Sequence, residues 1–273
     1  MERGTLEVHE IFLSGLRVDV RSSCVRTNRY LRRHWSAAKC PILRTEAAFD
    51  IEVIADGSPR IIVDGEEVWS DGVVEDLVCG FEQWLYRAAL GRHKGRFSVF
   101  HAAALVSNDA TVVFSGPSGA GKSSLALAAV RRGWKYFSDE FVVTDGKRVW
   151  GWPRAIRFDP PRSGADCPDY LVGLESDDDA AESQGDAGPP YYAVHGHAVQ
   201  RVACSAHEVR FVRINRGAET NLTPVSAAVG LKHWTEASFF EPTISLGALV
   251  GTDRTWRGSW RHPDELIDLI ETT

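Results

Sequence analysis

The chain has 273 residues, of which 44% are hydrophobic, and a formal net charge of −6. This composition fits a soluble globular protein with one large domain, or one domain with an added lobe. The acidic balance argues against a nucleic-acid binder, no apolar run is long enough to span a membrane, and the five cysteines form no C-x-x-C pair. Residues 1–4 also lack the apolar core of a signal peptide, so we expect a cytoplasmic protein with reduced thiols.

Residues 1–95 predict a β-rich lobe with one helix, packed on the rest of the chain. Residues 5–12 and 16–20 are strand candidates, and residues 49–54 alternate strictly between apolar and polar side chains. Asp-Gly pairs then supply turns before two further short strands. Apolar residues at helical spacing predict the helix over 73–88, with Asp71 as its cap.

Two strands follow this lobe, over residues 97–106 and 111–115, with a turn between them. The first strand carries His101. That histidine is a candidate to approach a phosphate group, and it is equally well explained as an ordinary half-buried residue.

Residues 116–123 read Gly-Pro-Ser-Gly-Ala-Gly-Lys-Ser, which is a complete phosphate-binding loop of the pattern G-x-x-x-x-G-K-S. A strand before it and a helix predicted over 124–130 supply the strand–loop–helix context. Lys122 would reach the β- and γ-phosphates of a nucleotide, and the Ser123 hydroxyl would bind Mg²⁺. We therefore expect ATP and Mg²⁺ as ligands, rather than a glycine-rich turn without function. The expected nucleotide-binding residues are Gly116, Pro117, Ser118, Gly119, Ala120, Gly121, Lys122, Ser123 and Ser124.

An acidic pair, Asp139 and Glu140, follows the next predicted strand. Gly133 stops the helix, and residues 134–137 return as a strand. A strand–helix–strand crossover is parallel and right-handed, so both strands end at the same edge of the sheet. This places the pair beside the phosphate-binding loop, where one carboxylate can bind Mg²⁺ and the other can accept a proton. The alternative is a solvated acidic turn.

Residues 141–144 and 148–150 flank an Asp-Gly turn and predict a hairpin. Arg154 and Arg157 follow in a proline-rich, extended stretch. They are candidates to neutralise charge in a transition state, or surface partners of acidic side chains.

The last third of the chain begins with an acidic stretch over 174–190 that predicts a flexible insertion, or a flap that becomes ordered on a cationic peptide. His195 and His197 are more simply structural than metal ligands. A strand is predicted over 207–214, and a helix that begins with Thr223 as cap and Pro224 in its first turn. Residues 244–250 form an apolar run of ambiguous structure, and residues 262–270 predict a C-terminal helix.

Taken together, these motifs resemble the HPr kinase/phosphorylase family over residues 97–160. The resemblance rests on the strand with His101, the loop, the Arg132-Gly133 pair ahead of Asp139-Glu140, and the stretch over 152–157. Glu140 in place of aspartate, Ser124 in place of glutamate and the lack of a long C-terminal signature favour shortened relatives, such as the lasso-peptide precursor kinases.

The resemblance implies an α/β protein with a mixed sheet, whose core over 96–273 is like the nucleotide half of phosphoenolpyruvate carboxykinase. It implies an ATP- and Mg²⁺-dependent kinase that phosphorylates a serine of a protein or ribosomal precursor peptide; homo-oligomerisation stays open. A small-molecule kinase and a non-catalytic nucleotide-binding regulator are the alternatives. The expected catalytic residues are Asp139, Glu140, Lys122, His101, Arg154 and Arg157. The expected metal-binding residues are Ser123, Glu140 and Asp139.

Overall fold

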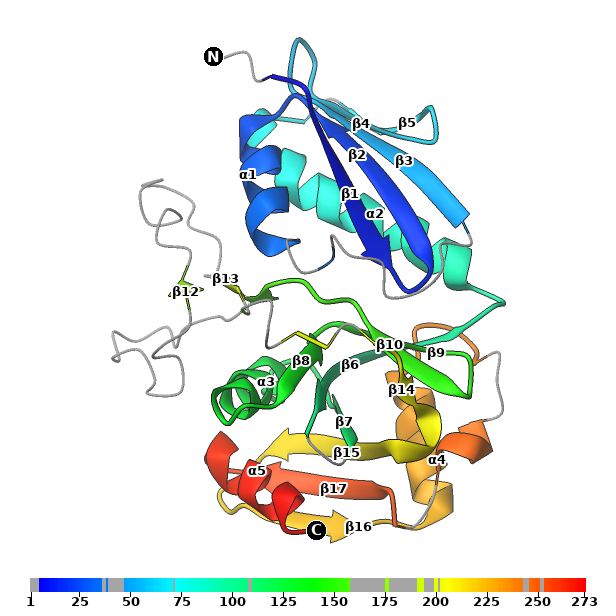
Figure 1. Ribbon diagram of the computed structural model, residues 1–273, viewed down its shortest axis with the longest axis vertical. Coiled ribbons are helices and arrows are strands. Elements are labelled where there is room, and N and C mark those ends of the chain that lie inside the picture. The colour runs from blue at the N-terminus through cyan, green and yellow to red at the C-terminus, as the bar shows by residue number, and fades with distance from the viewer. Residues whose placement is uncertain are drawn as a thin grey trace. The chain divides into compact units, whose positions relative to one another are not determined.

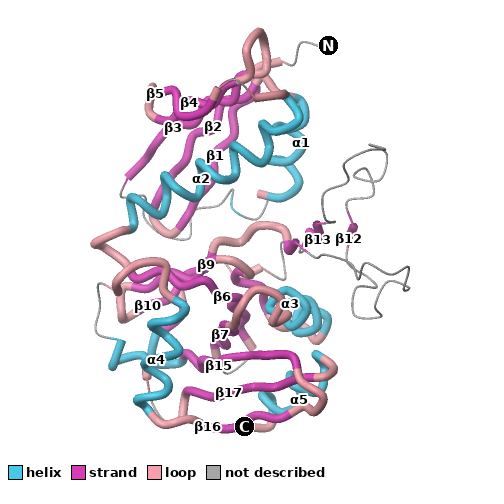
Figure 2. The backbone as a smooth tube through the Cα atoms, turned by 180° about the vertical axis from the view of Figure 1, so that it is seen from behind, coloured by secondary structure: helices cyan, strands magenta, loops and turns pink. Residues whose placement is uncertain are grey.

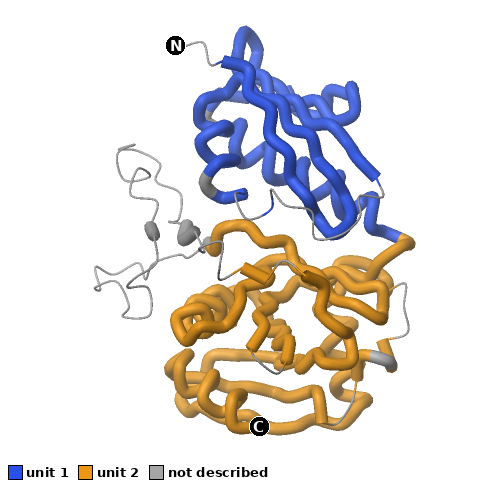
Figure 3. The backbone as a smooth tube through the Cα atoms, viewed as in Figure 1, with its two compact units in different colours: residues 1–94 blue, residues 95–273 orange. Residues whose placement is uncertain are grey.

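The computed structural model divides the chain into two compact units, Met1–Lys94 and Gly95–Thr273 (Figure 3). The division falls one residue before the boundary expected from the sequence. The structure describes residues 5–35, 38, 47–70, 72–107, 110–157, 175–176, 191–193, 199–200, 202–242, 246–250 and 253–273. Both units combine helices with β-sheets in which parallel and antiparallel pairs are mixed, so the chain is an α/β protein.

The first unit is a five-stranded sheet in the order β1-β2-β3-β4-β5, with two helices on one face (Figures 1 and 2). Strands β2 and β3 pair in parallel and the other neighbours are antiparallel. Alternate residues of β2, namely Leu16, Val18 and Val20, are buried, as expected for a sheet covered on one side. The elements are β1 (Glu7–Leu13), β2 (Leu16–Ser22), α1 (Val25–His34), β3 (Ala47–Ile54), β4 (Arg60–Val63), β5 (Glu66–Trp69), the 3₁₀ turn η2 (Val74–Asp76) and α2 (Leu77–His93).

Helix α1 corrects the prediction of a single helix in this unit. Its sequence holds four arginines, no acidic residue in the first turn and no capping side chain, so the usual signals of a helix start are missing. Its buried side is also largely polar: Asn28 lies against His9, and Tyr30 donates a hydrogen bond to Glu82. The predicted second helix is present as α2, whose expected cap Asp71 lies outside the described residues.

The second unit is built on a nine-stranded sheet in the order β14-β10-β9-β6-β7-β15-β17-β16, with β8 also paired to β6. Helix α4 covers one face, where Trp234 packs on Phe100 and Phe211 at ring-centroid distances of 4.6 and 4.2 Å. Helix α5 covers the other face (Figures 1 and 2). On that face the Leu266 side chain lies directly beside Gly258. The helices are α3 (Lys122–Arg131), α4 (Ala227–Ala237) and α5 (Pro263–Glu271).

The strands of this sheet follow the sequence closely in the middle of the chain and less closely towards its end. They are β6 (Ser98–Val106), β7 (Thr111–Ser115), β8 (Lys135–Ser138), β9 (Phe141–Thr144), β10 (Arg148–Gly151), β14 (Cys204–Ser205), β15 (Val209–Arg216), β16 (Asn221–Pro224) and β17 (Thr255–Trp260). A separate small sheet has the order β11-β13-β12. Its strands are β11 (Ile156–Arg157), β12 (Glu175–Ser176) and β13 (Tyr191–Ala193), and two 3₁₀ turns are η6 (Ala206–Glu208) and η7 (Leu246–Leu249).

The predicted crossover from β7 through α3 to β8 is present, with one difference. Both strands are antiparallel to β6, which lies between them, so they run in the same direction. Strand β8 ends at Ser138, directly before the acidic pair as expected, but the chain does not leave the sheet there and continues as β9. Strands β8 and β9 pair with successive parts of β6, and Glu140 sits in the irregular step between them, where its carbonyl accepts from the Ala102 amide at 3.2 Å. Such irregular steps re-aim side chains, and they are common beside active sites.

The helix predicted to start at Thr223 begins later. Residues Asn221–Pro224 form β16, which pairs antiparallel with β17, a strand that the sequence did not suggest. Helix α4 then starts at Ala227, and the Ser226 hydroxyl caps it by accepting from the Val229 amide. The C-terminal helix is confirmed as α5. The acidic stretch over 174–190, apart from β12, lies outside the described residues, as do His195 and His197.

Candidate active site

The loop between β7 and α3 has the backbone that its glycines predict. Strand β7 ends at Ser115, and α3 begins at Lys122 with Gly121 at the position before the helix. Gly119 and Gly121 have φ angles of 78° and 89°, in the left-handed region that favours glycine. The N-terminus of α3, with its free backbone N–H groups, therefore opens into the loop, which is the arrangement that binds anions.

The loop packs closely against two neighbouring strands, β15 and β17. A Cβ atom on Gly116 would lie 2.7 Å from the Ile214 carbonyl oxygen, so the loop begins directly against the backbone of β15. A Cβ atom on Gly121 would lie 2.1 Å from Cζ2 of Trp260. The Trp260 indole also donates from Nε1 to the Ala120 carbonyl at 3.1 Å. Trp260 is therefore a support for the loop that the sequence did not reveal, because its partner is distant along the chain.

Lys122 is buried inside the loop, and its Nζ donates to the Gly116 carbonyl at 3.2 Å. Burial lowers the pKa of this amine, while the charges of Glu140 and Asp139 oppose that shift and the charge of Arg213 adds to it. The ammonium group is thus hydrogen-bonded to a carbonyl and attracted by the charges of two carboxylates, and a phosphate oxygen can replace the carbonyl as its acceptor.

Asp139 is joined to the loop by a hydrogen bond from the Ser123 hydroxyl to its Oδ2 at 3.2 Å. The Tyr136 hydroxyl lies 3.2 Å from Oδ1 and 2.9 Å from the Arg154 carbonyl. The carboxyl group is almost fully buried, and burial raises its pKa to about 6 although Arg154 and both hydrogen bonds act in the other direction. A carboxylate with this pKa is a suitable proton acceptor near neutral pH.

Glu140 has different surroundings and is half-buried. Arg154, which is 5% exposed, donates from Nη2 to Oε2 at 3.3 Å, and His101 Nε2 lies 3.7 Å from Oε1. Burial and the charge of Lys122 lower the pKa of His101, while Glu140 opposes the shift. His101 is therefore neutral near pH 7, so it can accept or donate one hydrogen bond at a phosphate or hydroxyl group.

The structure thus brings six predicted site residues together: Lys122, Ser123, Asp139, Glu140, His101 and Arg154. Ser124 is buried in the first turn of α3. Arg157 lies in β11, and its side chain is outside the described part of the structure. Tyr136 joins the site without having been predicted, because an aromatic residue in a strand gives no signal beyond core packing.

No cluster of three or more histidine, cysteine or acidic side chains that could hold a metal occurs in the described residues. Mg²⁺ does not require such a cluster, because it is usually held by one or two carboxylates together with substrate phosphates and water. The contact of Ser123 with Asp139 brings the Ser123 hydroxyl next to the acidic pair, so a hydroxyl and a carboxylate are available at one point of the loop.

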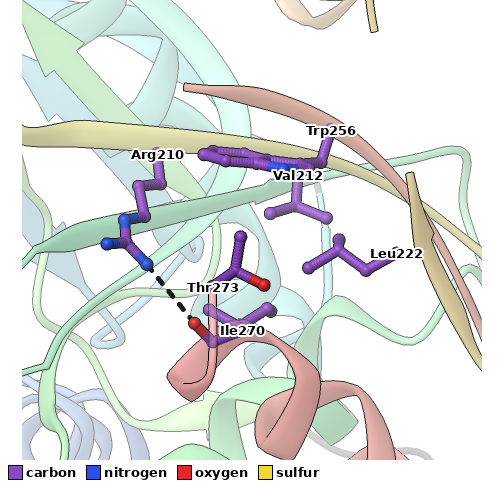
Figure 4. Close-up of a pocket in the computed structure, with 6 residues that line it drawn as sticks. All are labelled: Arg210, Val212, Leu222, Trp256, Ile270 and Thr273. Atoms are coloured by element: carbon purple, nitrogen blue, oxygen red, sulfur yellow. Dashed lines mark hydrogen bonds between the residues drawn. The ribbon is translucent and has the colours of Figure 1, made fainter. Parts of the chain in front are cut away.

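A small cavity lies elsewhere in this unit, between β15, β16, β17 and the end of α5 (Figure 4). Its volume is about 10 Å³, so it has room for about one water molecule and none for a nucleotide. Arg210 closes one side by donating to the Ile270 carbonyl at 3.3 Å. None of the six clustered site residues lines it.

No family model matches the chain, and no curated protein matches it. Among solved structures, the chain is similar to the Hpr(Ser) kinase/phosphatase from Coxiella burnetii at 16% identity and a TM-score of 0.27, over 64% of this chain and 91% of that chain. Among the described helices, none combines the length and the apolar character needed to cross a membrane.

Proposed function

We propose that the chain is an ATP- and Mg²⁺-dependent kinase that transfers the γ-phosphoryl group to a serine hydroxyl of a protein or peptide. The observation that carries the proposal is the hydrogen bond between Ser123 and Asp139, because it joins the phosphate-binding loop to a carboxylate that can take part in phosphoryl transfer. The serine acceptor is supported by the motif resemblance over residues 97–160.

The loop backbone and Lys122 would bind the phosphate chain, and Ser123 with one of the two acids, for which we assign Glu140, would hold Mg²⁺. The ion, when bound, neutralises charge on the β- and γ-phosphates. Lys122 stabilises negative charge on the transferring group, and Arg154 keeps Glu140 oriented through their 3.3 Å contact. Most of the rate enhancement in such a site comes from positioning and charge stabilisation.

Asp139 is the residue that we assign to proton transfer. The serine oxygen forms a bond to the γ-phosphorus, the bond from that phosphorus to the β–γ bridging oxygen breaks, and ADP leaves. The serine proton passes to Asp139. Its pKa of about 6 is close enough to neutral pH for the carboxylate to be ionised and still a useful base.

The test is incubation of the purified protein with γ-labelled ATP, Mg²⁺ and a panel of serine-containing peptides, followed by mass spectrometry. We expect a phosphoserine product that is absent when Lys122→Ala replaces the wild type. Tight ATP binding without transfer to any peptide or small hydroxyl compound would favour a nucleotide-binding regulator. Transfer to a small molecule alone would favour the small-molecule kinase.

A further inference from the structure

Arg213 lies beside the phosphate-binding loop on a strand that the loop motif does not include. In the parallel ladder between β7 and β15, Arg213 is the register partner of Ser115, the last residue before the loop. Its Nη1 donates to the Ser115 hydroxyl at 3.1 Å. The next residue of β15, Ile214, is the one whose carbonyl lies against Gly116. The guanidinium group is therefore held at the point where the loop leaves the sheet.

This guanidinium faces the loop from the side covered by α4. Phe211, two residues earlier on β15, packs on Trp234 of α4, and Arg213 itself pairs with Glu236 of the same helix at 3.3 Å. Asp139 meets the loop at Ser123, on α3. Arg213 and Asp139 thus approach the loop through different elements.

A second cation at this position has an electrostatic cost. Lys122 donates to the Gly116 carbonyl and Arg213 donates to the hydroxyl of the adjacent Ser115, so two like charges repel each other across the start of the loop. Glu236 offsets only part of that cost, because its side chain is 40% exposed and the ion pair is screened by water. An anion with more than one negative charge, placed between the two cations, removes the repulsion.

We propose that Arg213 binds the terminal phosphoryl group of the nucleotide, on the opposite side from Lys122. This inference rests on the proposed function and adds a contact that distinguishes ATP from ADP. Arginine suits the task because its planar fork can hold Ser115 with one N–H and a phosphate oxygen with another. In the transition state, the same contact stabilises charge on the transferring group.

The experiment compares the affinities of ADP and a non-hydrolysable ATP analogue, both with Mg²⁺, by isothermal titration calorimetry. For Arg213→Gln we expect the affinity for the ATP analogue to fall about tenfold or more, while the affinity for ADP changes less than about twofold. Arg213→Lys keeps the charge and loses the fork, so it should lose about threefold or more of the preference for the ATP analogue. Glu236→Gln is the matched control, and it should leave that preference intact.

Equal weakening of both nucleotides by Arg213→Gln would overturn the inference, because it would mean that Arg213 supports the loop through Ser115 instead of contacting the ligand. An unchanged preference for the ATP analogue over ADP in either arginine variant would also overturn the inference. If Arg213→Gln does not fold, the result for Arg213→Lys is used as the test. Failure of the wild type to bind either nucleotide would refute the proposed function itself. Nucleotide binding by the wild type with an unaltered ratio in the variants refutes only the role of Arg213.

Discussion

The Ser123 hydroxyl donates to the Asp139 carboxylate across 3.2 Å, and this hydrogen bond joins two motifs that lie on opposite sides of α3 in the chain. Glu140, the neighbour of Asp139, is turned instead towards Arg154 and His101. The two adjacent acids therefore have different partners, and we expect them to have different roles.

Substitution of each acid by its amide separates these roles. Asp139→Asn keeps the shape and the contact with Ser123 but cannot take a proton, so we expect nucleotide binding to persist and phosphoryl transfer to fall by about 10²- to 10⁴-fold. Glu140→Gln should instead raise the Mg²⁺ concentration needed for half-maximal activity. Initial rates as a function of Mg²⁺, with nucleotide affinities measured separately, give both results. If Asp139→Asn retained full activity, or if the two phenotypes were exchanged, our assignment of the base would be wrong.

The buried Asp139 should also make the stability of the protein depend on pH. Burial raises its pKa from the ordinary value of 3.8 to about 6, so the folded protein binds this proton more tightly than the unfolded chain. The free energy of unfolding therefore falls as pH rises between these two values, by at most about 3 kcal/mol. Asp139→Asn has no carboxyl group to titrate at this position, so it does not lose this stability as pH rises. Its free energy of unfolding relative to wild type should therefore increase from pH 4 to pH 7. Urea unfolding across that range is the measurement.

Asp145 provides a control of opposite sign. Its pKa is lowered, because hydrogen bonds from the Arg148 and Lys147 amides outweigh its partial burial. Its contribution to stability is present at neutral pH and is lost as pH falls through its folded pKa. Asp145→Asn should therefore be less stable than wild type at pH 7. A similar response of the two variants to pH would contradict the assignment for Asp139.

The parts of the fold that could be predicted are those in which local chemistry decides the structure. The loop requires glycines and a following helix, so its sequence predicts β7, the turn and α3. The Asp145-Gly146 turn likewise predicts the hairpin of β9 and β10. Helix α1 and strand β17 were missed for the opposite reason. The first buries polar side chains, and the second includes Gly258, which weakens a strand pattern.

The parts of the site that could not be predicted depend on contacts between distant segments. Ser115 and Arg213 are 98 positions apart, and Ala120 and Trp260 are 140 apart. A short motif carries no information about such partners, since they are brought together by the parallel pairing of β7, β15 and β17. The acidic pair could be placed beside the loop because the handedness of the crossover limits where the returning strand lies.

The two glycines with positive φ should respond differently to alanine. At Gly119 an added Cβ would meet no atom within 4 Å, so Gly119→Ala should cost only the left-handed backbone strain of about 1–2 kcal/mol. At Gly121 the Cβ would also collide with the Trp260 ring, so Gly121→Ala should cost clearly more and should weaken nucleotide binding. Thermal unfolding of both variants, with Trp260→Ala added to Gly121→Ala to remove the collision, measures the two contributions. Equal destabilisation by the two single variants would argue against the packing of Trp260 on the loop.

The start of α4 can be tested by a pair of conservative substitutions. The Ser226 hydroxyl accepts from the Val229 amide at the N-terminus of this helix, whereas Thr223 lies in β16 and is exposed. Removal of a capping hydroxyl typically costs about 1 kcal/mol. Ser226→Ala should therefore lower the free energy of unfolding by about that amount, and Thr223→Ala should change it by less than about 0.5 kcal/mol. The reverse order of effects in urea unfolding would favour a helix that starts at Thr223, as its sequence pattern alone suggests, and would contradict the pairing of β16 with β17.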